Sequence, residues 1–336
     1  MRLITINNIK IMTQQLGLMP FISQVISALE EDFARWPEFN KSPRHATLYP
    51  QGVIELMPCS DNKLYSFKFV NGHPGNTAKG RLCVVALGVL AEVETGYPLM
   101  LSEMTLLTAF RTAATSALGA KYLARKNSRH LALIGTGAQA EFQLLAMQTV
   151  LPIDKVSYFD PDPEAMSKFH RHMNTHASLY PCKSIAKAIE SADIIITATA
   201  AKKHNCLIDR SMIQAGVHIH GMGGDCPGKT ELDPTLLQEC KIVVEYLPQS
   251  RDEGEIQNMP GVDVYAELWE LISGQKIARQ DKTEITLFDS VGFALEDYAI
   301  LRIVYRLALE LNIGHEVDLI PSPADPKDLF GVLETP

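Results

Sequence analysis

Apolar and polar residues follow two patterns in the first hundred residues of the chain. Over residues 11–36 the apolar side chains recur at helical spacing, which predicts one amphipathic helix or a pair of helices broken near Pro20. Shorter apolar runs, separated by turn-forming residues, predict β-strands at residues 52–58, 64–70, 82–93 and 97–102. Because short turns join neighbouring runs, we expect antiparallel hairpins in this part of the chain.

The pattern changes after Ser102. Residues 104–124 are rich in Ala and Leu and predict one long helix. Helical segments then alternate with short apolar runs, which predict strands near residues 131–135, 155–160, 179–182, 193–198, 217–221 and 241–245. This repeated strand–helix–strand spacing is typical of a doubly wound parallel sheet. A polar loop at 248–261, a long helix at 293–312 and an irregular tail from residue 321 complete the prediction.

A glycine turn follows the first strand of this second part. Gly135, Gly137 and Ala140 form the pattern G-x-G-x-x-A between a buried strand and a helix. The first glycine makes the turn, the second lets the backbone approach a pyrophosphate, and the third small residue lets helix and strand pack closely. An ordinary strand–turn–helix would also fit this pattern. Asp160, 25 residues after Gly135, strengthens the ligand interpretation, because an acidic residue there binds ribose hydroxyls and repels a 2′-phosphate.

These patterns predict an α/β protein with two domains. Residues 119–304 are expected to form a doubly wound parallel-sheet (Rossmann) domain that binds NAD rather than NADP. This domain is inserted into a discontinuous α+β domain, which consists of residues 1–118 and 305–336.

Composition narrows the class of protein. The chain has 336 residues, of which 46% are hydrophobic and 21% charged, and its formal net charge is −8. This balance does not favour nucleic acid or an anionic membrane as partner. There is no apolar run of membrane-spanning length and no signal-peptide core, so we expect a cytoplasmic protein. The six cysteines form no C-x-x-C pair and no histidine spacing suggests zinc, so we expect free thiols and no metal.

Charged residues in unusual places are candidates for chemistry. Asp225 ends a glycine-rich turn after an apolar strand, where it could exchange protons with a substrate amine, although an ordinary turn would also contain an aspartate. Glu55 interrupts an apolar strand, either on a solvated face or buried with a raised pKa. The cations Arg44, Lys68 and Arg111 have apolar or small neighbours and could pair with a carboxylate, although each alone is more often a surface charge.

Several separated motifs together carry a family resemblance. They are Gly52–Pro58 (GVIELMP), Lys68–Pro74 (KFVNGHP), Arg111–Ala114 (RTAA), Ile134–Gln139 (IGTGAQ), Gly223–Leu232 (GGDCPGKTEL) and Phe288–Asp297 (FDSVGFALED). With these motifs the chain resembles the ornithine cyclodeaminase/mu-crystallin family over essentially its full length, and most closely the bacterial cyclodeaminases within it.

The resemblance implies a reaction and assigns roles. It implies that L-ornithine becomes L-proline and ammonia, with NAD recycled, and that the first domain binds the substrate and joins sheets with a second copy in a homodimer. Asp225 would be the acid–base and Glu55 would assist it. The substrate would meet Arg44, Lys68, Arg111, Asp225 and Val291. The cofactor site would comprise Cys83, Arg111, Gly135, Gly137, Ala138, Gln139, Asp160, Thr199, Met222, Gly223, Gly224, Lys229 and Ser290. Similar enzymes can carry a hydroxyl residue in place of Cys83.

Three other functions stay open at this point. A pocket longer by one methylene changes substrate preference only modestly, by about 1–3 kcal/mol, so the sequence does not decide between ornithine and lysine. A reductase of cyclic imino acids could use the same residues. A non-enzymatic, crystallin-like protein could bind a dinucleotide and a small ligand, but it would give no reason for Asp225 beside Glu55.

Overall fold

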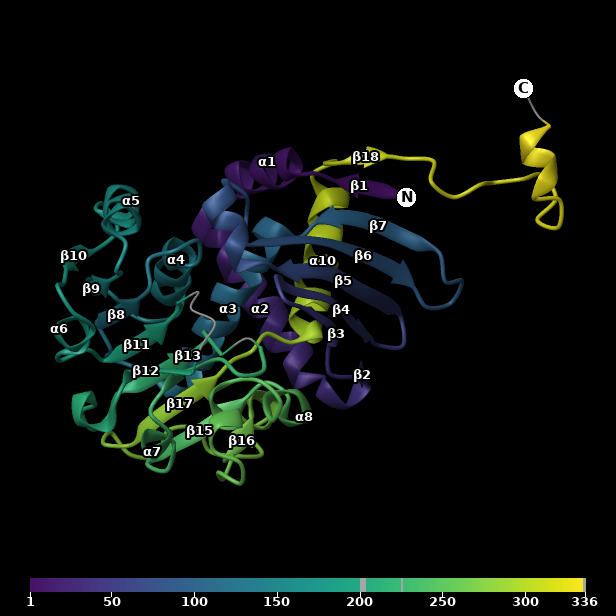
Figure 1. The fold of residues 1–336 in the computed structure, drawn as a ribbon. Coiled ribbons are helices and arrows are strands. Elements are labelled where there is room, and N and C mark those ends of the chain that lie inside the picture. Colours follow the sequence, from purple (N-terminus) through teal and green to yellow (C-terminus); the bar gives the residue numbers. More distant parts are fainter. Residues whose placement is uncertain (200–203, 225, 335–336) are drawn as a thin grey trace.

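The computed structural model describes residues 1–199, 204–224 and 226–334, without the side chains of residues 204 and 205. Within these ranges the strands form two eight-stranded sheets and one two-stranded sheet (Figure 1). The expected α/β architecture is confirmed. Strands β12 (His204–Ile208) and β14 (Thr230–Leu232) form the small parallel sheet.

The first sheet has the strand order β18-β1-β7-β6-β5-β4-β2, and β3 pairs with β4. Its strands are β1 (Arg2–Ile4), β2 (Asn40–Lys41), β3 (His45–Tyr49), β4 (Gly52–Ser60), β5 (Leu64–Gly72), β6 (Val84–Glu92), β7 (Pro98–Glu103) and β18 (His315–Glu316). The pairs β4–β5, β5–β6 and β6–β7 are antiparallel, so the expected antiparallel hairpins are confirmed. Strand β1 pairs in parallel with β7 and extends the sheet on that side, which the pattern did not predict.

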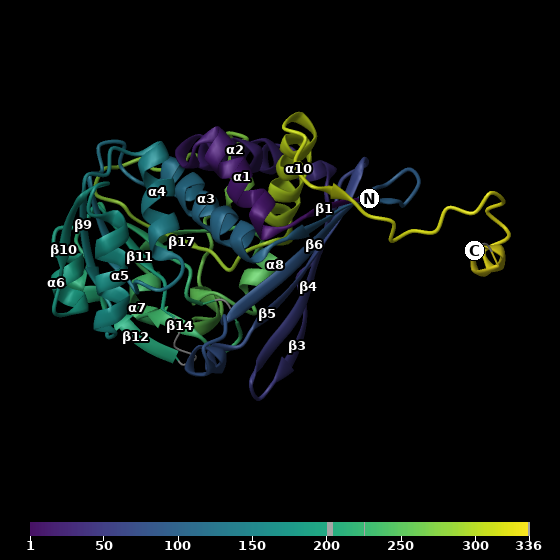
Figure 2. The same cartoon turned by 90° about the horizontal axis from the view of Figure 1, so that it is seen from above.

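Helices cover one face of the first sheet (Figure 2). They include α1 (Ile6–Leu16), α2 (Leu18–Ala34) and α10 (Ala294–Glu310). The predicted helix pair is confirmed, but its break lies at Gly17, where φ is +82°, a conformation that glycine adopts without strain. Pro20 instead lies in the first turn of α2, where its missing N–H group leaves no hydrogen bond unmade.

Helix α10 brings the end of the chain back to the first sheet. It packs against β4, β5 and β6 and against α2. Most of this helix precedes residue 305, where the second part of the discontinuous domain was expected to begin, so the chain has already returned to the first sheet when α10 starts. The expected domain limits stay a prediction.

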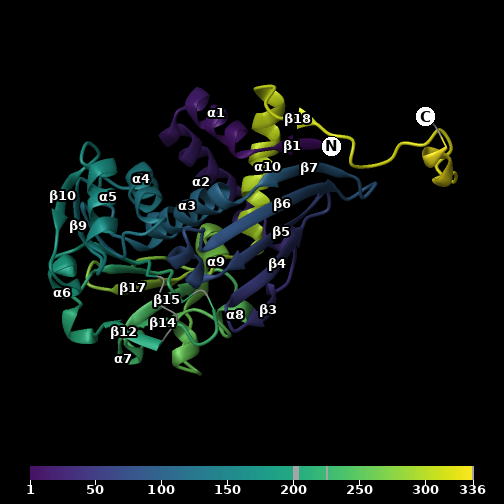
Figure 3. The same cartoon turned by 45° about the horizontal axis from the view of Figure 1, so that its top comes forward.

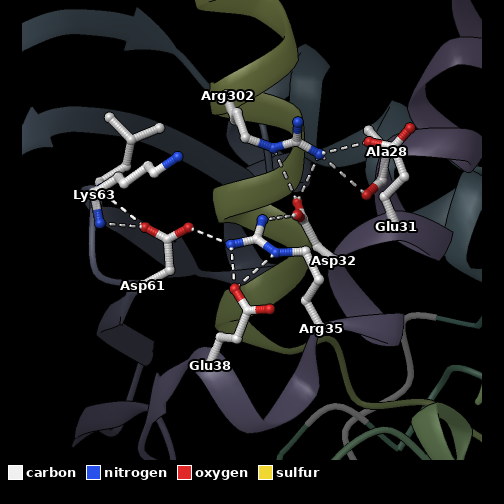
Figure 4. A network of polar contacts seen from close by, with 9 residues as sticks. Ala28, Glu31, Asp32, Arg35, Glu38, Asp61, Lys63 and Arg302 are labelled. Atoms are coloured by element: carbon white, nitrogen blue, oxygen red, sulfur yellow. Dashed lines mark hydrogen bonds and ion pairs between the residues drawn. The ribbon is translucent and has the colours of Figure 1, made fainter.

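An ionic network fastens α2 to α10 and to the turn before β5 (Figure 4). Asp32 of α2 accepts hydrogen bonds from Arg302 at 3.1 Å and from Arg35 at 3.3 Å. Arg35 also donates to Asp61 at 2.7 Å. Burial raises the pKa of Asp32 to about 6, although both arginines act to lower it. The network therefore joins three segments that lie far apart in sequence.

The second sheet is entirely parallel and has the order β10-β9-β8-β11-β13-β17-β15-β16. Its strands are β8 (His130–Ile134), β9 (Lys155–Phe159), β10 (Ser178–Pro181), β11 (Ile194–Thr197), β13 (His218–Gly221), β15 (Cys240–Val244), β16 (Ala266–Glu267) and β17 (Ile285–Asp289). From β8 the chain first extends the sheet through β9 and β10, then returns to place β11 on the other side. This reversal between β8 and β11 creates the crevice where open α/β sheets bind ligands.

Helix α3 (Thr105–Leu123) lies between the two sheets (Figure 3). It contacts β6 of the first sheet and β13 and β17 of the second. The long helix expected over residues 104–124 is thus confirmed, and it places Arg111 between the sheets. The remaining helices are α4 (Ala140–Val150), α5 (Pro163–Met173), α6 (Ile185–Ile189), α7 (Pro234–Leu237), α8 (Leu247–Ser250) and α9 (Leu268–Ile272).

The segment expected to be a polar loop, residues 248–261, is partly helical. It contains most of α8 and a short 3-10 helix, Glu255–Asn258. Its prediction as loop is therefore wrong in these parts, because helices this short have too few turns to show a periodic pattern. No helix in the described part of the chain is long and apolar enough to cross a membrane.

Candidate functional site

The glycine turn after β8 opens toward the crevice. A Cβ atom at Gly135, where φ is +99°, would lie 2.5 Å from the Ala198 carbonyl oxygen, so the fold itself requires this glycine. At Gly137, by contrast, no described atom lies within 4 Å of such a Cβ. Helix α4 begins directly afterwards at Ala140, and its positive N-terminal end adjoins this open space. The residues present therefore fit a pyrophosphate-bearing ligand.

Asp160 lies at the end of β9 beside this turn. Its Oδ2 accepts hydrogen bonds from the backbone N–H of Thr136 at 2.6 Å and from the Thr136 hydroxyl at 3.3 Å. Its Oδ1 accepts one from Asp162 N at 2.9 Å. Backbone groups thus hold the carboxylate in place as an acceptor. This is the position that the sequence assigned to a ribose-binding acid.

Two further side chains lie beside the glycine turn after β8. Gln139 Oε1 is buried and has no hydrogen-bond partner among the described residues, so it is available to a ligand. Lys168 of α5 donates to the Gly137 carbonyl oxygen at 2.9 Å and pairs with Glu141 at 2.8 Å. No local pattern singles out Lys168, because its partners lie at least 27 residues away along the chain.

The other expected cofactor residues lie along the carboxyl ends of β11, β13 and β17. Lys229 Nζ donates to the Thr199 carbonyl oxygen at 3.0 Å, and Thr199 N donates to Glu231 Oε1 at 3.1 Å. A Cβ at Gly223 would lie 1.8 Å from Glu231 Oε2, which explains the need for glycine there. Gly224 O accepts a hydrogen bond from Gly254 N at 2.6 Å. Glu231, which holds this loop, was part of a quoted motif but had no assigned role.

The first sheet contributes a buried cationic centre. Lys68, on the inner face of β5, donates from Nζ to Asp297 Oδ1 at 2.9 Å, and its side chain is 1% exposed. The same oxygen lies 3.0 Å from Nε of Arg111. Arg111 also donates from Nη1 to Glu296. Strand β5 and helices α3 and α10 therefore meet at one carboxylate oxygen.

Burial changes the acid–base properties of this centre. Burial, together with the positive charge of Arg111, lowers the pKa of Lys68 to about 8, while Asp297 opposes the shift. Burial also raises the pKa of Glu245 and of Glu296, which hydrogen-bond to each other. The charge of Glu245 raises the pKa of Glu296 further. Both carboxyl groups therefore hold a proton more readily than an exposed glutamate does.

Arg44 joins the first sheet to the loops of the second. Its Nη1 donates to Glu55 Oε1 at 3.2 Å, and its Nε lies 3.2 Å from Glu253 Oε2. Its Nη2 donates to the carbonyl oxygens of Val291 and Gly292 at 2.5 and 2.6 Å. Glu55 is buried on the inner face of β4, so it does not lie on a solvated face of the strand.

The turn at Val291 and Gly292 connects the two cationic groups. A Cβ at Gly292 would lie 2.7 Å from Nη1 of Arg111, and the Gly292 carbonyl oxygen binds Arg44. Glu245 fixes this turn by accepting a hydrogen bond from Val291 N at 2.8 Å and another from the Ser290 hydroxyl. The structure thereby brings Arg44, Arg111 and Ser290 to one place.

Two further expected residues are Asp225 and Cys83. Asp225 lies outside the described residues. Cys83 is half-buried just before β6, and its carbonyl oxygen accepts a hydrogen bond from His73 N at 2.9 Å. Met222 and Ala138 lie in the loops after β13 and β8, as their positions in the sequence require. The roles expected for all of these residues stay predictions.

The fold and this site define a Rossmann-type α/β protein with a buried ionic centre between its two sheets. The model of the ornithine cyclodeaminase/mu-crystallin family matches residues 8–312, and the chain belongs to this family. An ornithine cyclodeaminase from Agrobacterium fabrum (strain C58 / ATCC 33970) is 49% identical over 331 residues, which cover 98% of this chain and 94% of that protein.

Solved structures agree with the family assignment. A lysine cyclodeaminase, described for its recognition of L-lysine, L-ornithine and L-2,4-diaminobutyric acid, superposes with a TM-score of 0.93. It is 28% identical, and the match covers 98% of each chain. An archaeal alanine dehydrogenase dimer with bound NAD has a TM-score of 0.87 and 34% identity, with 95% of this chain and 99% of that chain covered.

Proposed function

We propose that the chain is an NAD-dependent ornithine cyclodeaminase that converts L-ornithine to L-proline and ammonia. The observation that carries this proposal is the buried set of Lys68, Arg111 and Arg44 beside the crevice of the parallel sheet. A zwitterionic amino acid needs fixed cations for its carboxylate, and these cations are held by α3, β5 and the segment before β3. The similarity to the Agrobacterium enzyme, at 49% identity over nearly the full chain, supports the same reaction.

NAD fits the other side of the crevice. Gly135, Gly137 and the start of α4 would hold its pyrophosphate, and Asp160 would accept hydrogen bonds from its ribose. Lys229, Thr199 and Ser290 would line the remainder of the site. When bound there, NAD supplies a redox partner for the substrate α-carbon, first as oxidant and then, in reduced form, as reductant. Because Asp160 is a fixed anion, it disfavours the additional phosphate of NADP.

The ionic centre would orient the substrate. Lys68 and Arg111 would bind the α-carboxylate, and Arg44 would close the site from the direction of Val291. Fixing the carboxylate sets the direction in which the α-hydrogen points, and holding the folded chain brings the distal amine close to the α-carbon. Such positioning can be worth several orders of magnitude in rate.

Proton transfers require groups beside the two amines. We assign Asp225 as the acid–base that removes and returns the amine protons, because its motif places it after the β13 loop glycines. Glu55 would assist near the distal amine. Ring closure releases the α-nitrogen as ammonia, which needs a proton that a nearby carboxylic acid can donate.

We also propose a homodimer built on the first sheet. The face of β4, β5 and β6 that points away from the helices exposes large apolar side chains, among them Leu56, Phe69 and Leu87, which lie opposite one another across three strands. Figure 2 shows no described helix on that face. A continuous apolar surface of this kind is typical of a subunit interface. A cytoplasmic location fits the free thiols expected of a reducing compartment.

The test is an incubation of purified protein with L-ornithine and catalytic NAD, in which proline, ammonia and reduced cofactor are followed together. Equal amounts of proline and ammonia without net reduced cofactor would establish the internal redox cycle. Accumulating reduced cofactor would indicate an amino-acid dehydrogenase. Pipecolate from lysine, with no product from ornithine, would change the substrate and retain the mechanism. No turnover of any amino acid, despite NAD binding, would contradict an enzymatic function.

A further inference from the structure

The chain ends in a segment that leaves the body of the molecule. Directly after β18, Val317 N donates a hydrogen bond to the Met1 carbonyl oxygen at 2.9 Å, which ties the backbone to the body of the molecule. Residues 318–334, which we call the C-terminal arm, then run outward and end in a short 3-10 helix, Phe330–Leu333. The arm points away from both sheets in all three views (Figures 1–3).

The arm carries more apolar surface than a solvated tail. Leu329, Phe330 and Leu333 are 61%, 68% and 79% exposed, and Leu319 and Ile320 are also exposed. Tails that stay in solvent are typically poor in large apolar and aromatic residues, since such residues gain free energy on burial. The composition of the arm therefore indicates that it packs against a protein surface.

The arm is ordered locally between its two apolar segments. Pro321, Pro323 and Pro326 lie there, and each proline ring restricts the backbone. Asp325 Oδ1 accepts a hydrogen bond from Lys327 N and Asp328 Oδ1 accepts one from Gly331 N, both at 2.9 Å. Local turns thus order the arm without the body of its own subunit.

The place where the arm begins indicates its partner. It starts at β18, an edge strand of the first sheet, whose outer face is the apolar surface described above. In a two-fold dimer through that face, an arm directed away from its own sheet runs along the other subunit. The family model ends at residue 312, so the arm lies outside the part of the chain that the model matches.

We propose that the C-terminal arm of each subunit packs on a second copy of this chain and fastens the dimer. The inference rests on the proposed dimer. Exchange of such arms adds two equivalent contacts to a symmetric interface, because each subunit both gives and receives one. The residues that make the contact are Leu329, Phe330 and Leu333, with Leu319 and Ile320 closer to the sheet.

The experiment measures the dimer dissociation constant by sedimentation of three proteins. They are the full chain, a chain ending at Val317, and the triple variant Leu329→Ser, Phe330→Ser, Leu333→Ser. We expect the two altered proteins to dissociate at concentrations at least tenfold higher than the full chain. A dissociation constant unchanged within twofold would overturn the arm contact and leave the dimer intact. A full chain that sediments as a monomer would overturn both.

Proline formation in the same samples separates this inference from the enzymatic one. A monomer or a loosened dimer that still makes proline contradicts nothing in the proposed reaction, whereas a tight dimer without turnover contradicts only the reaction.

The arm's single lysine, Lys327, gives a second readout after treatment with an amine-reactive crosslinker. We expect its crosslinked peptides in the covalent dimer band of a denaturing gel. Their appearance in the monomer band would show that the arm folds onto its own subunit and would overturn the proposal. Lys327→Arg is the control, which should lose these peptides and keep the dimer.

Discussion

Lys68 and Asp297 are 229 residues apart in the chain, and they meet at 2.9 Å, with Nζ of the lysine donating to Oδ1 of the aspartate. Both side chains are withdrawn from solvent. The same oxygen serves Arg111, so one carboxylate balances two cations that would otherwise repel each other. The start of α10 is therefore as much a part of the candidate site as the strands and loops that the motifs mark.

Replacing this carboxylate should destabilise the fold. In Asp297→Asn, Lys68 and Arg111 lose their shared anion while they stay buried, and breaking a buried ion pair on one side costs about 3–5 kcal/mol. The free energy of unfolding in urea measures this loss. Glu310→Gln, on the same helix, removes an exposed carboxylate 3.7 Å from Arg306 and should change stability by about 1 kcal/mol or less. Equal effects of the two substitutions would contradict the role given to Asp297.

The pH dependence of catalysis should reflect Lys68. Because its pKa is about 8 in the folded chain, Lys68 loses its charge as the pH rises past 8, and its hold on the substrate carboxylate weakens. We expect kcat/KM for ornithine to fall above pH 8. In Lys68→Arg the side chain stays charged, so the decrease in kcat/KM that comes from residue 68 should disappear. An identical profile in both proteins would assign the titration to the substrate or to another group.

The same shift has a consequence for stability. The folded pKa of about 8 lies below the ordinary lysine pKa of 10.5, so the unfolded chain binds more protons between these two pH values. The contribution of Lys68 to stability therefore rises with pH through this window and is least favourable below pH 8. Compared with Lys68→Met, the wild-type chain should gain free energy of unfolding between pH 8 and pH 10. A difference that stays constant over this range would contradict the lowered pKa.

The two glycines of the turn after β8 should respond differently to alanine. Gly137→Ala adds a methyl group to open space, so the melting temperature should change little while the dissociation constant for NADH rises at least tenfold. Gly135→Ala combines a positive φ with a Cβ 2.5 Å from the Ala198 carbonyl oxygen, so the fold itself should lose stability. Cofactor fluorescence and thermal unfolding separate the two effects. Tight NADH binding by Gly137→Ala would contradict the proposed pyrophosphate position.

Asp160 should decide between the two nicotinamide cofactors. In Asp160→Ser the fixed anion is lost, so NADH should bind more weakly and the preference for NADH over NADPH should fall at least tenfold. Fluorescence titration with both cofactors measures this ratio. Asp154→Ser is a matched control, because Asp154 lies at the opposite end of β9 and pairs with exposed Arg129. An unchanged ratio in Asp160→Ser would place the ribose elsewhere.

The acid–base assignment predicts a separation of binding from turnover. Asp225→Asn should bind NADH normally and lose about 10²–10⁴-fold in turnover, the range typical of general acid–base catalysis. Asp252→Asn, in an exposed part of the chain, should keep both properties. Near-normal proline formation by Asp225→Asn would remove Asp225 from the mechanism.

Local patterns predicted the elements of this protein better than its ionic contacts. Short apolar runs separated by turn-forming residues predicted β4 and β5, because a hairpin encodes both its strands and its turn locally. Strand β17 was not predicted, because Thr286 interrupts its short apolar run and Asp289 ends it. Burial alone does not hide a strand, since β8 is equally buried and was predicted. The helix break lies at Gly17 and not near Pro20, because a helix tolerates proline in its first turn.

The candidate site also contains contacts that local sequence patterns cannot predict. The cations Arg44, Lys68 and Arg111 could be selected from their apolar surroundings, and the structure buries all three. Their partners Glu253, Glu296 and Asp297 were not assigned a role. Glu296 meets Arg111 across 185 residues of sequence, and no local pattern encodes a contact of that length. The motif Phe288–Asp297 contained the only signal, namely two adjacent acids at the start of an otherwise apolar helix.

The position of Arg44 has a mechanical consequence. Its guanidinium is tied at the same time to Glu55 of the first sheet and to Glu253 and the 291–292 carbonyl groups on the loops of the second sheet. Arg44 thus links the first sheet to the loops of the second sheet. A movement of these loops away from the first sheet would require Arg44 to exchange hydrogen-bond partners. Each exchange would free an N–H group of the guanidinium, to which the carboxylate of an incoming substrate could bind.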